Sequence, residues 1–151
     1  MLKVGDKAPD FDLMSDEGKQ IKLRERLGKT VVLYFYPKDD TPGCTKEACA
    51  FRDDLPRFEG VNADVLGISL DSVKSHQAFK KKFGLNFALL SDENAKTSKA
   101  YGVYKKKSMY GRTYWGIERT TFVISPEGTI QAVFPKVKVD GHSQELLKAL
   151  S

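Results

Sequence analysis

Apolar residues along the chain gather into short runs separated by polar turns. Residues 30–36 form the most continuous run, with β-branched and aromatic side chains at nearly every position. Such a strand is typical of the middle of a sheet that is covered on both faces. Residues 65–70 and 87–90 are two further apolar runs. We therefore expect three inner strands in one sheet.

Polar turn residues join other runs into two hairpins. Residues 11–13 and 20–23 flank a polar turn at residues 16–18, which predicts a short N-terminal β-hairpin. Residues 120–125 and 129–134 flank the sequence Pro126-Glu-Gly128, which predicts a second hairpin near the end of the chain.

Helices are expected between these strands. One follows the loop that ends at Pro42, a second begins near Asp71 or Ser72 and ends at Gly84, a short one covers residues 94–101, and a last one covers residues 143–150. Strands that alternate with helices and end in a hairpin predict an α/β fold, with helices on both sides of a mixed sheet. No repeat or linker divides the chain, so we expect residues 1–151 to form a single domain.

Composition excludes several classes of protein. Hydrophobic residues make up 40% of the 151 residues and charged residues 30%, which is ordinary for a globular protein. The longest apolar run, residues 31–36, is far shorter than the ~20 residues of a membrane helix. The first residues lack an apolar targeting segment, so we expect a cytoplasmic protein whose cysteines lie in reducing surroundings.

The net charge of +5 is mild. Much of it comes from the triplets Lys80–Lys82 and Lys105–Lys107, and no aromatic-rich recognition motif accompanies them. We interpret the triplets as solvated surfaces and expect no partner of the nucleic-acid or membrane class.

Both cysteines lie at the start of the first long helix. Thr41 is a favoured N-cap residue, and Pro42 suits the first helical position. Cys44 then falls in the first turn, where free backbone N–H groups and the positive end of the helix dipole stabilise a thiolate. A thiolate at this place is a candidate nucleophile.

Helical periodicity separates the two sulfurs. Cys44, Ala48, Phe51 and Leu55 form one apolar stripe, so Cys44 faces the protein body at the carboxyl end of the central strand. Cys49 is rotated by about 140°, and ideal helix geometry puts the two Cα atoms roughly 8.7 Å apart, beyond the ~6.8 Å reach of a disulfide. The pair either has no role or is a redox couple that closes after the first turns unwind.

The segment Pro37-x-x-x-Thr41-x-x-Cys44 resembles the active-site signature of the peroxiredoxins. The longer string Thr41-Pro-Gly-Cys-Thr-Lys-Glu-Ala-Cys-Ala-Phe-Arg-Asp53 is similar to the Q-type branch of that family, also called bacterioferritin-comigratory protein. Residues 5–11, 31–37 and 116–124 match the same branch, so the resemblance covers nearly the whole chain.

The resemblance implies a thioredoxin-like fold with an N-terminal extension, and a peroxidase that reduces hydrogen peroxide and organic hydroperoxides. Cys44 would be the peroxidatic cysteine, which becomes a sulfenic acid. Cys49 would be the resolving cysteine that closes an intramolecular disulfide. Thioredoxin or a glutaredoxin-like reductant would then reduce it. Q-type relatives are often monomers, so we expect a monomer.

The chemistry of such a site requires hydrogen-bond donors, because negative charge develops on the leaving oxygen of the peroxide. We expect the backbone N–H groups of Gly43 and Cys44, the hydroxyl of Thr41 and the guanidinium of Arg119 to bind the peroxide. Arg119 suits the role because its charged, planar guanidinium can donate hydrogen bonds to two acceptors at once. Pro37 is expected to shape the loop and shield the thiolate from water.

Three further residues are weaker candidates. Glu47 either tunes Arg119 or caps the helix, or it is a solvated helical position. Trp115 and Tyr114 are expected to pack near the mouth of the pocket.

Other kinds of function stay open from the residues alone. A disulfide oxidoreductase is disfavoured because Cys-x-x-Cys is absent, and a basic binding module predicts slow reaction with peroxide and a salt-dependent attraction to polyanions. The two cysteines with His76 and His142 lack zinc-ligand spacing, so we expect no metal. We expect no bound cofactor, because sulfur carries out the chemistry that the resemblance implies. We interpret His76 as a packed helix residue.

Overall fold

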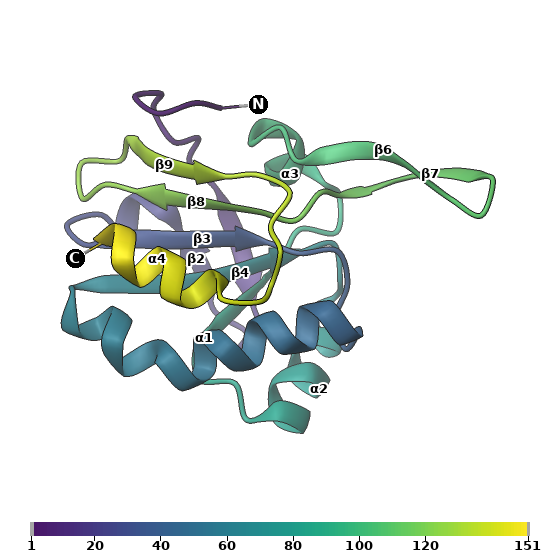
Figure 1. The fold of residues 1–151 in the computed structure, drawn as a ribbon, viewed down its shortest axis with the longest axis horizontal. Helices are drawn as coiled ribbons and strands as arrows, with labels where there is room; N and C mark the ends of the chain where they lie inside the picture. Colours follow the sequence, from purple (N-terminus) through teal and green to yellow (C-terminus); the bar gives the residue numbers. More distant parts are fainter. Residues whose placement is uncertain (1, 151) are drawn as a thin grey trace.

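The structure is a computed structural model that describes residues 2–150 and contains a seven-stranded mixed sheet of order β2-β1-β5-β4-β3-β8-β9 (Figure 1). Strands β3 (Thr30–Phe35), β4 (Ala63–Ser69) and β5 (Ala88–Ser91) are parallel to one another, and the other neighbours are antiparallel. These strands confirm the three inner strands expected from the apolar runs.

The central strand β3 divides two hydrophobic cores. Val31, Leu33 and Phe35 pack into one core, and Val32 and Tyr34 pack into the other. All five are buried, because successive side chains of a strand point to opposite faces and both faces here are covered. The near-continuous apolar run is explained by this double burial.

Three helices cover one face of the sheet. Helix α1 (Pro42–Gly60) connects β3 to β4, and α2 (Val73–Phe83) connects β4 to β5. Both connections step across the sheet in the same direction, so their right-handed crossovers place both helices on the same face. Helix α4 (His142–Leu150) packs beside α1 on that face (Figure 1).

The opposite face is covered by shorter elements. These include the N-terminal segment with Phe11, the 3-10 helix η1 (Leu23–Glu25), and helix α3 (Lys96–Ala100) with the chain that follows it. Tyr101 and Val103, directly after α3, are fully buried in this core. Helices therefore lie on both sides of the sheet, as the sequence predicts.

Both predicted hairpins are confirmed. Strands β1 (Asp12–Ser15) and β2 (Gln20–Lys22) pair and extend the sheet beside β5. Strands β8 (Thr120–Ile124) and β9 (Ile130–Phe134) form the second hairpin on the other side of β3. No helix among residues 2–150 has the length and apolar character needed to cross a bilayer.

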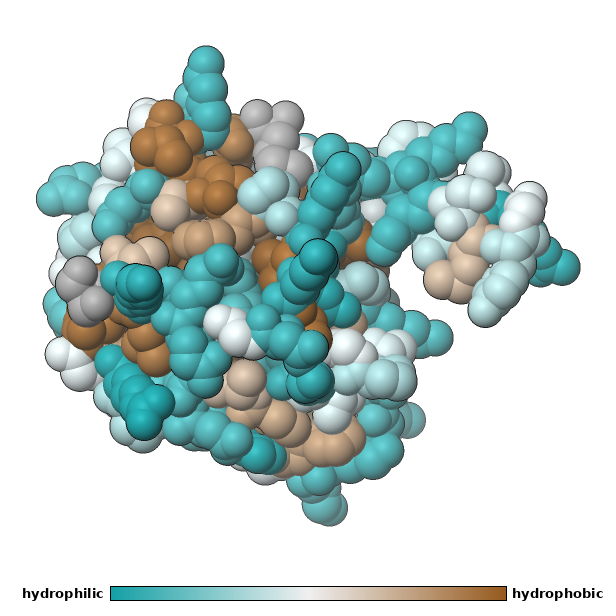
Figure 2. Space-filling model, in the orientation of Figure 1, coloured by the Kyte–Doolittle hydropathy of each residue, from teal (hydrophilic) through white to brown (hydrophobic). Residues whose placement is uncertain are grey.

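A third hairpin was not expected from the sequence. Strands β6 (Tyr104–Met109) and β7 (Arg112–Ile117) pair only with each other and project from the body, as Figures 1 and 2 show. Its turn places Tyr110 and Gly111 at φ 53° and 76°, values that two-residue hairpin turns require. Tyrosine is uncommon at such a position, which is why the turn gave no signal in the sequence.

Candidate active site

The start of α1 has the predicted arrangement. Thr41 is the N-cap residue and Pro42 is the first helical residue. Cys44 lies in the first turn with 1% of its surface exposed, packed in the same core as Ala48 and Phe51. The sulfur therefore faces inward beside the end of β3, as the helical stripe indicates.

The side chain of Thr41 does not cap the helix. Its hydroxyl donates to the carbonyl oxygen of Lys38 at 2.8 Å. The first-turn N–H groups of Gly43 and Cys44 therefore have no capping side chain and stay available to an anion. With its proton donated to Lys38, the hydroxyl oxygen of Thr41 is left as an acceptor, in place of the donor role expected from the sequence.

Arg119 lies between β7 and β8 and reaches the cysteine. Its Nη2 donates to Cys44 Sγ at 3.2 Å, and its Nη1 donates to Glu47 Oε1 at 2.7 Å. Burial opposes the charge of Arg119, but Glu47 and Cys44 outweigh burial and raise its pKa, so the guanidinium stays charged. Gly43 leaves room for it, because a Cβ at Gly43 would lie 3.2 Å from Nη2.

Glu47 is buried beneath the guanidinium. Burial raises the pKa of Glu47 to about 7, although the charge and the hydrogen bond of Arg119 act in the opposite direction. Its second oxygen, Oε2, is buried without a hydrogen-bond partner among the described residues. Of the sequence alternatives, the structure therefore favours the tuning of Arg119 over a solvated helical position.

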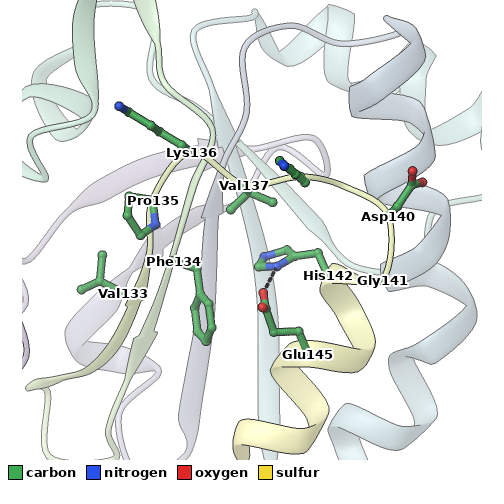
Figure 3. Close-up of a pocket in the computed structure, with 10 residues that line it drawn as sticks. Val133, Phe134, Pro135, Lys136, Val137, Asp140, Gly141, His142 and Glu145 are labelled. Atoms are coloured by element: carbon green, nitrogen blue, oxygen red, sulfur yellow. Dashed lines mark hydrogen bonds and ion pairs between the residues drawn. The ribbon is translucent and has the colours of Figure 1, made fainter.

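The backbone of Arg119 is fixed from its other side. Val137, in the loop between β9 and α4, donates its N–H to the carbonyl oxygen of Arg119 at 3.0 Å. This loop lines a cavity of about 440 Å³ in which His142 hydrogen-bonds Glu145 at 3.0 Å (Figure 3). His142 also hydrogen-bonds Thr121 at 2.8 Å, so the loop is tied to β8 next to Arg119.

A buried network anchors the loop that precedes Cys44. Asp39 lies 2.7 Å from His76 Nδ1 and accepts a hydrogen bond from Tyr36 Oη at 2.6 Å. His76 Nε2 lies 2.9 Å from the carbonyl oxygen of Leu90. Burial alone would lower the pKa of His76, but the hydrogen bond and charge of Asp39 outweigh burial and raise it.

This network goes beyond the packed histidine expected from the sequence. Ligand atoms of Asp39, Asp71 and His76 lie within 4.8 Å of one another, a spacing compatible with a metal ion. Each of these groups already makes internal hydrogen bonds, including one from the backbone N–H of Asp39 to Asp71 at 2.8 Å. We therefore interpret the cluster as an anchor of the loop. Sequence reasoning missed it because nothing local links Asp39 to a helix residue 37 positions away.

Cys49 follows Cys44 on the same uninterrupted helix. Both thiols are free, and Cys49 is partly exposed whereas Cys44 is buried. This agrees with helix geometry, which keeps the two sulfurs apart while the first turns are intact.

The remaining candidates lie around the site. Pro37 is half-buried directly after β3, at the start of the anchored loop. Trp115 is 58% exposed and stacks on Tyr104 within the projecting hairpin, with ring centroids 5.6 Å apart. Tyr114 is 41% exposed on the same hairpin. The sequence led us to expect Trp115 to pack near the mouth of the pocket. The structure instead places it on the surface of the hairpin.

Comparison with known proteins gives consistent matches. Residues 4–133 match the AhpC/TSA family. The chain is 56% identical over 149 residues to a putative peroxiredoxin bcp of Coxiella burnetii, covering 99% of both chains. It is 47% identical over 149 residues to peroxiredoxin Bcp of Bacillus subtilis, covering 99% of this chain and 95% of the relative.

Solved structures agree in fold. The bacterioferritin comigratory protein of Xanthomonas campestris, described for its alkyl peroxide reduction activity, has a TM-score of 0.92 and 44% identity, with 98% of this chain and 97% of that chain covered. A cysteine-to-serine variant of PrxQ from Xylella fastidiosa has a TM-score of 0.94 and 43% identity, with 99% and 96% covered. The thioredoxin-like α/β fold expected from the sequence is confirmed.

Proposed function

This chain belongs to the AhpC/TSA family and is a thiol peroxidase of the peroxiredoxin Bcp type, and we propose that Cys44 is its peroxidatic cysteine. The observation that carries the proposal is a pair of hydrogen bonds from the guanidinium of Arg119. One goes to Cys44 Sγ at 3.2 Å and the other to Glu47 at 2.7 Å. A fixed cation against an inward-facing sulfur favours the thiolate that the reaction needs.

The first step of the proposed mechanism is attack of the Cys44 thiolate on one oxygen of a peroxide. An S–O bond forms and the O–O bond breaks, so sulfur is oxidised to sulfenic acid while the second oxygen leaves and takes a proton to become water or an alcohol. Arg119 and the N–H groups of Gly43 and Cys44 stabilise the developing negative charge. Thr41 accepts the hydrogen bond of the peroxide O–H and orients it, because its own proton is donated to Lys38.

Cys49 is the proposed resolving cysteine. Its thiol condenses with the Cys44 sulfenic acid, forming a disulfide and releasing water. Because both residues lie on the intact helix α1, the first turns must unwind before the sulfurs meet. Gly43 is a poor helix former in those turns and Thr41 gives them no side-chain cap, which lowers the cost of unwinding.

The substrate is a peroxide and the reductant is a thiol. More specifically, we propose that hydrogen peroxide and organic hydroperoxides are both reduced, supported by the alkyl peroxide activity described for the Xanthomonas relative. Thioredoxin or a glutaredoxin-like dithiol protein regenerates Cys44 and Cys49. We further propose that the protein acts as a monomeric, single-domain enzyme in the cytoplasm.

One experiment tests the roles of both cysteines. Reduced protein is mixed with one equivalent of hydrogen peroxide and followed by mass spectrometry, beside the variants Cys44→Ser and Cys49→Ser. We expect the parent to lose two hydrogens through a Cys44–Cys49 disulfide while its helix signal falls. Cys49→Ser should stop at an oxidised Cys44, and Cys44→Ser should stay unchanged.

Other outcomes would contradict the proposal. A parent protein that stays fully reduced during the mixing would rule out Cys44 as a peroxidatic cysteine. Oxidation of Cys44→Ser at the parent rate would move the reactive sulfur to Cys49.

A further inference from the structure

Lys107 is a second basic side chain, and it bonds the end of the strand that leads into Arg119. It lies on β6, half-buried, and its Nζ donates to the carbonyl oxygen of Ile117 at 2.7 Å. The side chain therefore runs back along the hairpin to its base, and its ammonium lies beside the strand end that leads into Arg119. The sequence led us to expect a solvated lysine here, and the structure corrects that expectation.

The hairpin is built to direct Lys107 this way. Its register pairs Lys107 with Tyr114, and the alternation of strand side chains puts Gly116 on the same face. A Cβ at Gly116 would lie 3.4 Å from both the Lys107 stem and the Tyr114 ring, so the missing side chain leaves space for the two to lie against the backbone. Lys106 projects from the opposite face and is exposed.

The charges of the catalytic groups act on Lys107. Burial lowers the pKa of Lys107, and the positive charge of Arg119 lowers it further, whereas Cys44 and Glu118 act to raise it. The hydrogen bond to Ile117, two residues before Arg119, places the ammonium next to the segment that carries Arg119. In this half-buried place, charges are screened less than in water.

The charges at the site also need a second cation. Arg119 donates to both Cys44 and Glu47, so one guanidinium faces a thiolate and a carboxylate. Above a pH of about 7, where Glu47 is ionised, a thiolate at Cys44 brings the three groups to a net charge of about −1. An uncompensated negative charge in a partly buried site disfavours the thiolate.

We propose that Lys107 is a positioning residue of this active site, which holds the base of the hairpin beside Arg119 and supplies the second positive charge that stabilises the Cys44 thiolate. The inference rests on the proposed peroxidase function, because it assigns the reactive thiolate to Cys44. Lys107 acts through charge and through the backbone of Ile117 and does not need to touch the peroxide.

The test compares two lysines of the same strand. Lys107→Gln and Lys106→Gln are made in a Cys49→Ser background, so that Cys44 is the one remaining thiol. The rate of Cys44 alkylation by iodoacetamide is measured from pH 5 to pH 10, which reports the pH at which half of the thiol is ionised. We expect Lys107→Gln to move this midpoint upward and to slow alkylation at pH 6 by about fivefold, whereas Lys106→Gln matches the parent.

Two further variants separate charge from packing. Lys107→Arg should restore the midpoint, and Lys107→Met, which keeps an apolar stem, should shift it as Lys107→Gln does. With both cysteines present, Lys107→Gln should also react with hydrogen peroxide severalfold more slowly at pH 6 and approach the parent rate at high pH.

Equal midpoints for Lys107→Gln and the parent would overturn the inference, and so would an equal shift in Lys106→Gln or a failure of Lys107→Arg to restore the parent value. Alkylation does not depend on peroxide. A parent that alkylates normally but ignores peroxide would therefore refute the proposed function, whereas equal midpoints in a parent that consumes peroxide would refute the role of Lys107 alone.

Discussion

At the scale of single residues, Glu47 combines burial with a strong ion pair. Its carboxyl group is 2% exposed and bonds Arg119, yet burial raises its pKa to about 7. Consider an acid whose pKa is higher in the folded protein than in the unfolded chain. Its protonated form stabilises the fold, and this contribution is complete when the pH is below the pKa of the unfolded chain. The contribution is lost as the pH rises through the pKa of the folded protein.

We therefore expect the reduced parent to lose stability relative to Glu47→Gln between pH 4.5 and about 7, by up to about 3 kcal/mol. Urea unfolding of both proteins at pH 5 and pH 8 measures the change. Glu59→Gln, an exposed position on the same helix, is the matched control and should show no such trend. A constant difference between parent and Glu47→Gln would mean that Glu47 is ionised throughout this range.

Tyr34 in the central strand and Tyr36 directly after it are both buried, but their hydroxyl groups differ in hydrogen bonding. Tyr34 Oη has no hydrogen-bond partner among the described residues, whereas Tyr36 Oη donates to Asp39 at 2.6 Å. We expect Tyr34→Phe to leave stability unchanged or to raise it by about 1 kcal/mol, and Tyr36→Phe to lower it by about 2 kcal/mol. Thermal unfolding of the two variants provides the comparison, and equal effects would contradict this distinction.

At the scale of elements, α1 is a 19-residue helix that continues through a proline. Pro56 has no N–H for the carbonyl oxygen of Arg52, four residues earlier. The side chain of Asn86 supplies the missing donor, with Nδ2 at 3.1 Å from that oxygen. The break in the helix ladder is therefore repaired from the loop between α2 and β5.

A double-mutant cycle tests this repair. We expect Asn86→Ala to lower the free energy of unfolding by about 0.5 kcal/mol in the parent and by less in Pro56→Ala, where the backbone N–H returns. Urea unfolding of the four proteins gives the coupling. Equal losses in both backgrounds would show that Asn86 does not compensate for Pro56.

The element that carries the reactive cysteine is thus stable over most of its length and weakest at its first turn. Thr41 adds no side-chain cap there, and Gly43 adds little helical preference. The same features that leave N–H groups free for an anion also ease the unwinding proposed for disulfide formation.

At the scale of the whole molecule, the network of Asp39 and His76 joins parts that are distant in the sequence. Asp39 belongs to the loop after β3, His76 to α2, and the carbonyl of Leu90 to β5. Asp39 raises the pKa of His76 against the effect of burial, so the charged pair stabilises the fold below the ordinary histidine pKa of about 6.5. This stabilisation is lost as the pH rises through the higher pKa that His76 has in the folded protein.

We expect Asp39→Asn to cost about 3 kcal/mol at pH 6 and less at pH 9, where His76 is less protonated in the parent. Urea unfolding at both pH values measures the difference. Asp40→Asn is the matched control, because Asp40 is exposed and pairs with Lys82 at the surface, and it should change stability by less than about 1 kcal/mol at either pH. A cost of Asp39→Asn that is the same at both pH values would contradict a charged Asp39–His76 pair.

Local patterns in the sequence predict most of this fold. The run over residues 30–36 predicts the central strand, Ser72 and Gly84 mark the ends of α2, and Thr41-Pro42 marks the start of α1. The projecting hairpin was missed because its turn uses Tyr110 and its strands carry a lysine triplet in place of alternating apolar residues.

Capping and helical periodicity act between near neighbours in the chain, so the amino-acid order predicts Cys44 in the first turn of an amphipathic helix and Cys49 on another side of it. The charges that meet at the sulfur come together only when the chain folds. Arg119 is 75 positions from Cys44 and 72 from Glu47, and the hairpin brings Lys107 to the carbonyl oxygen of Ile117. Contacts over such separations depend on how the sheet brings strand ends together, and burial at that junction then sets the ionisation of Glu47.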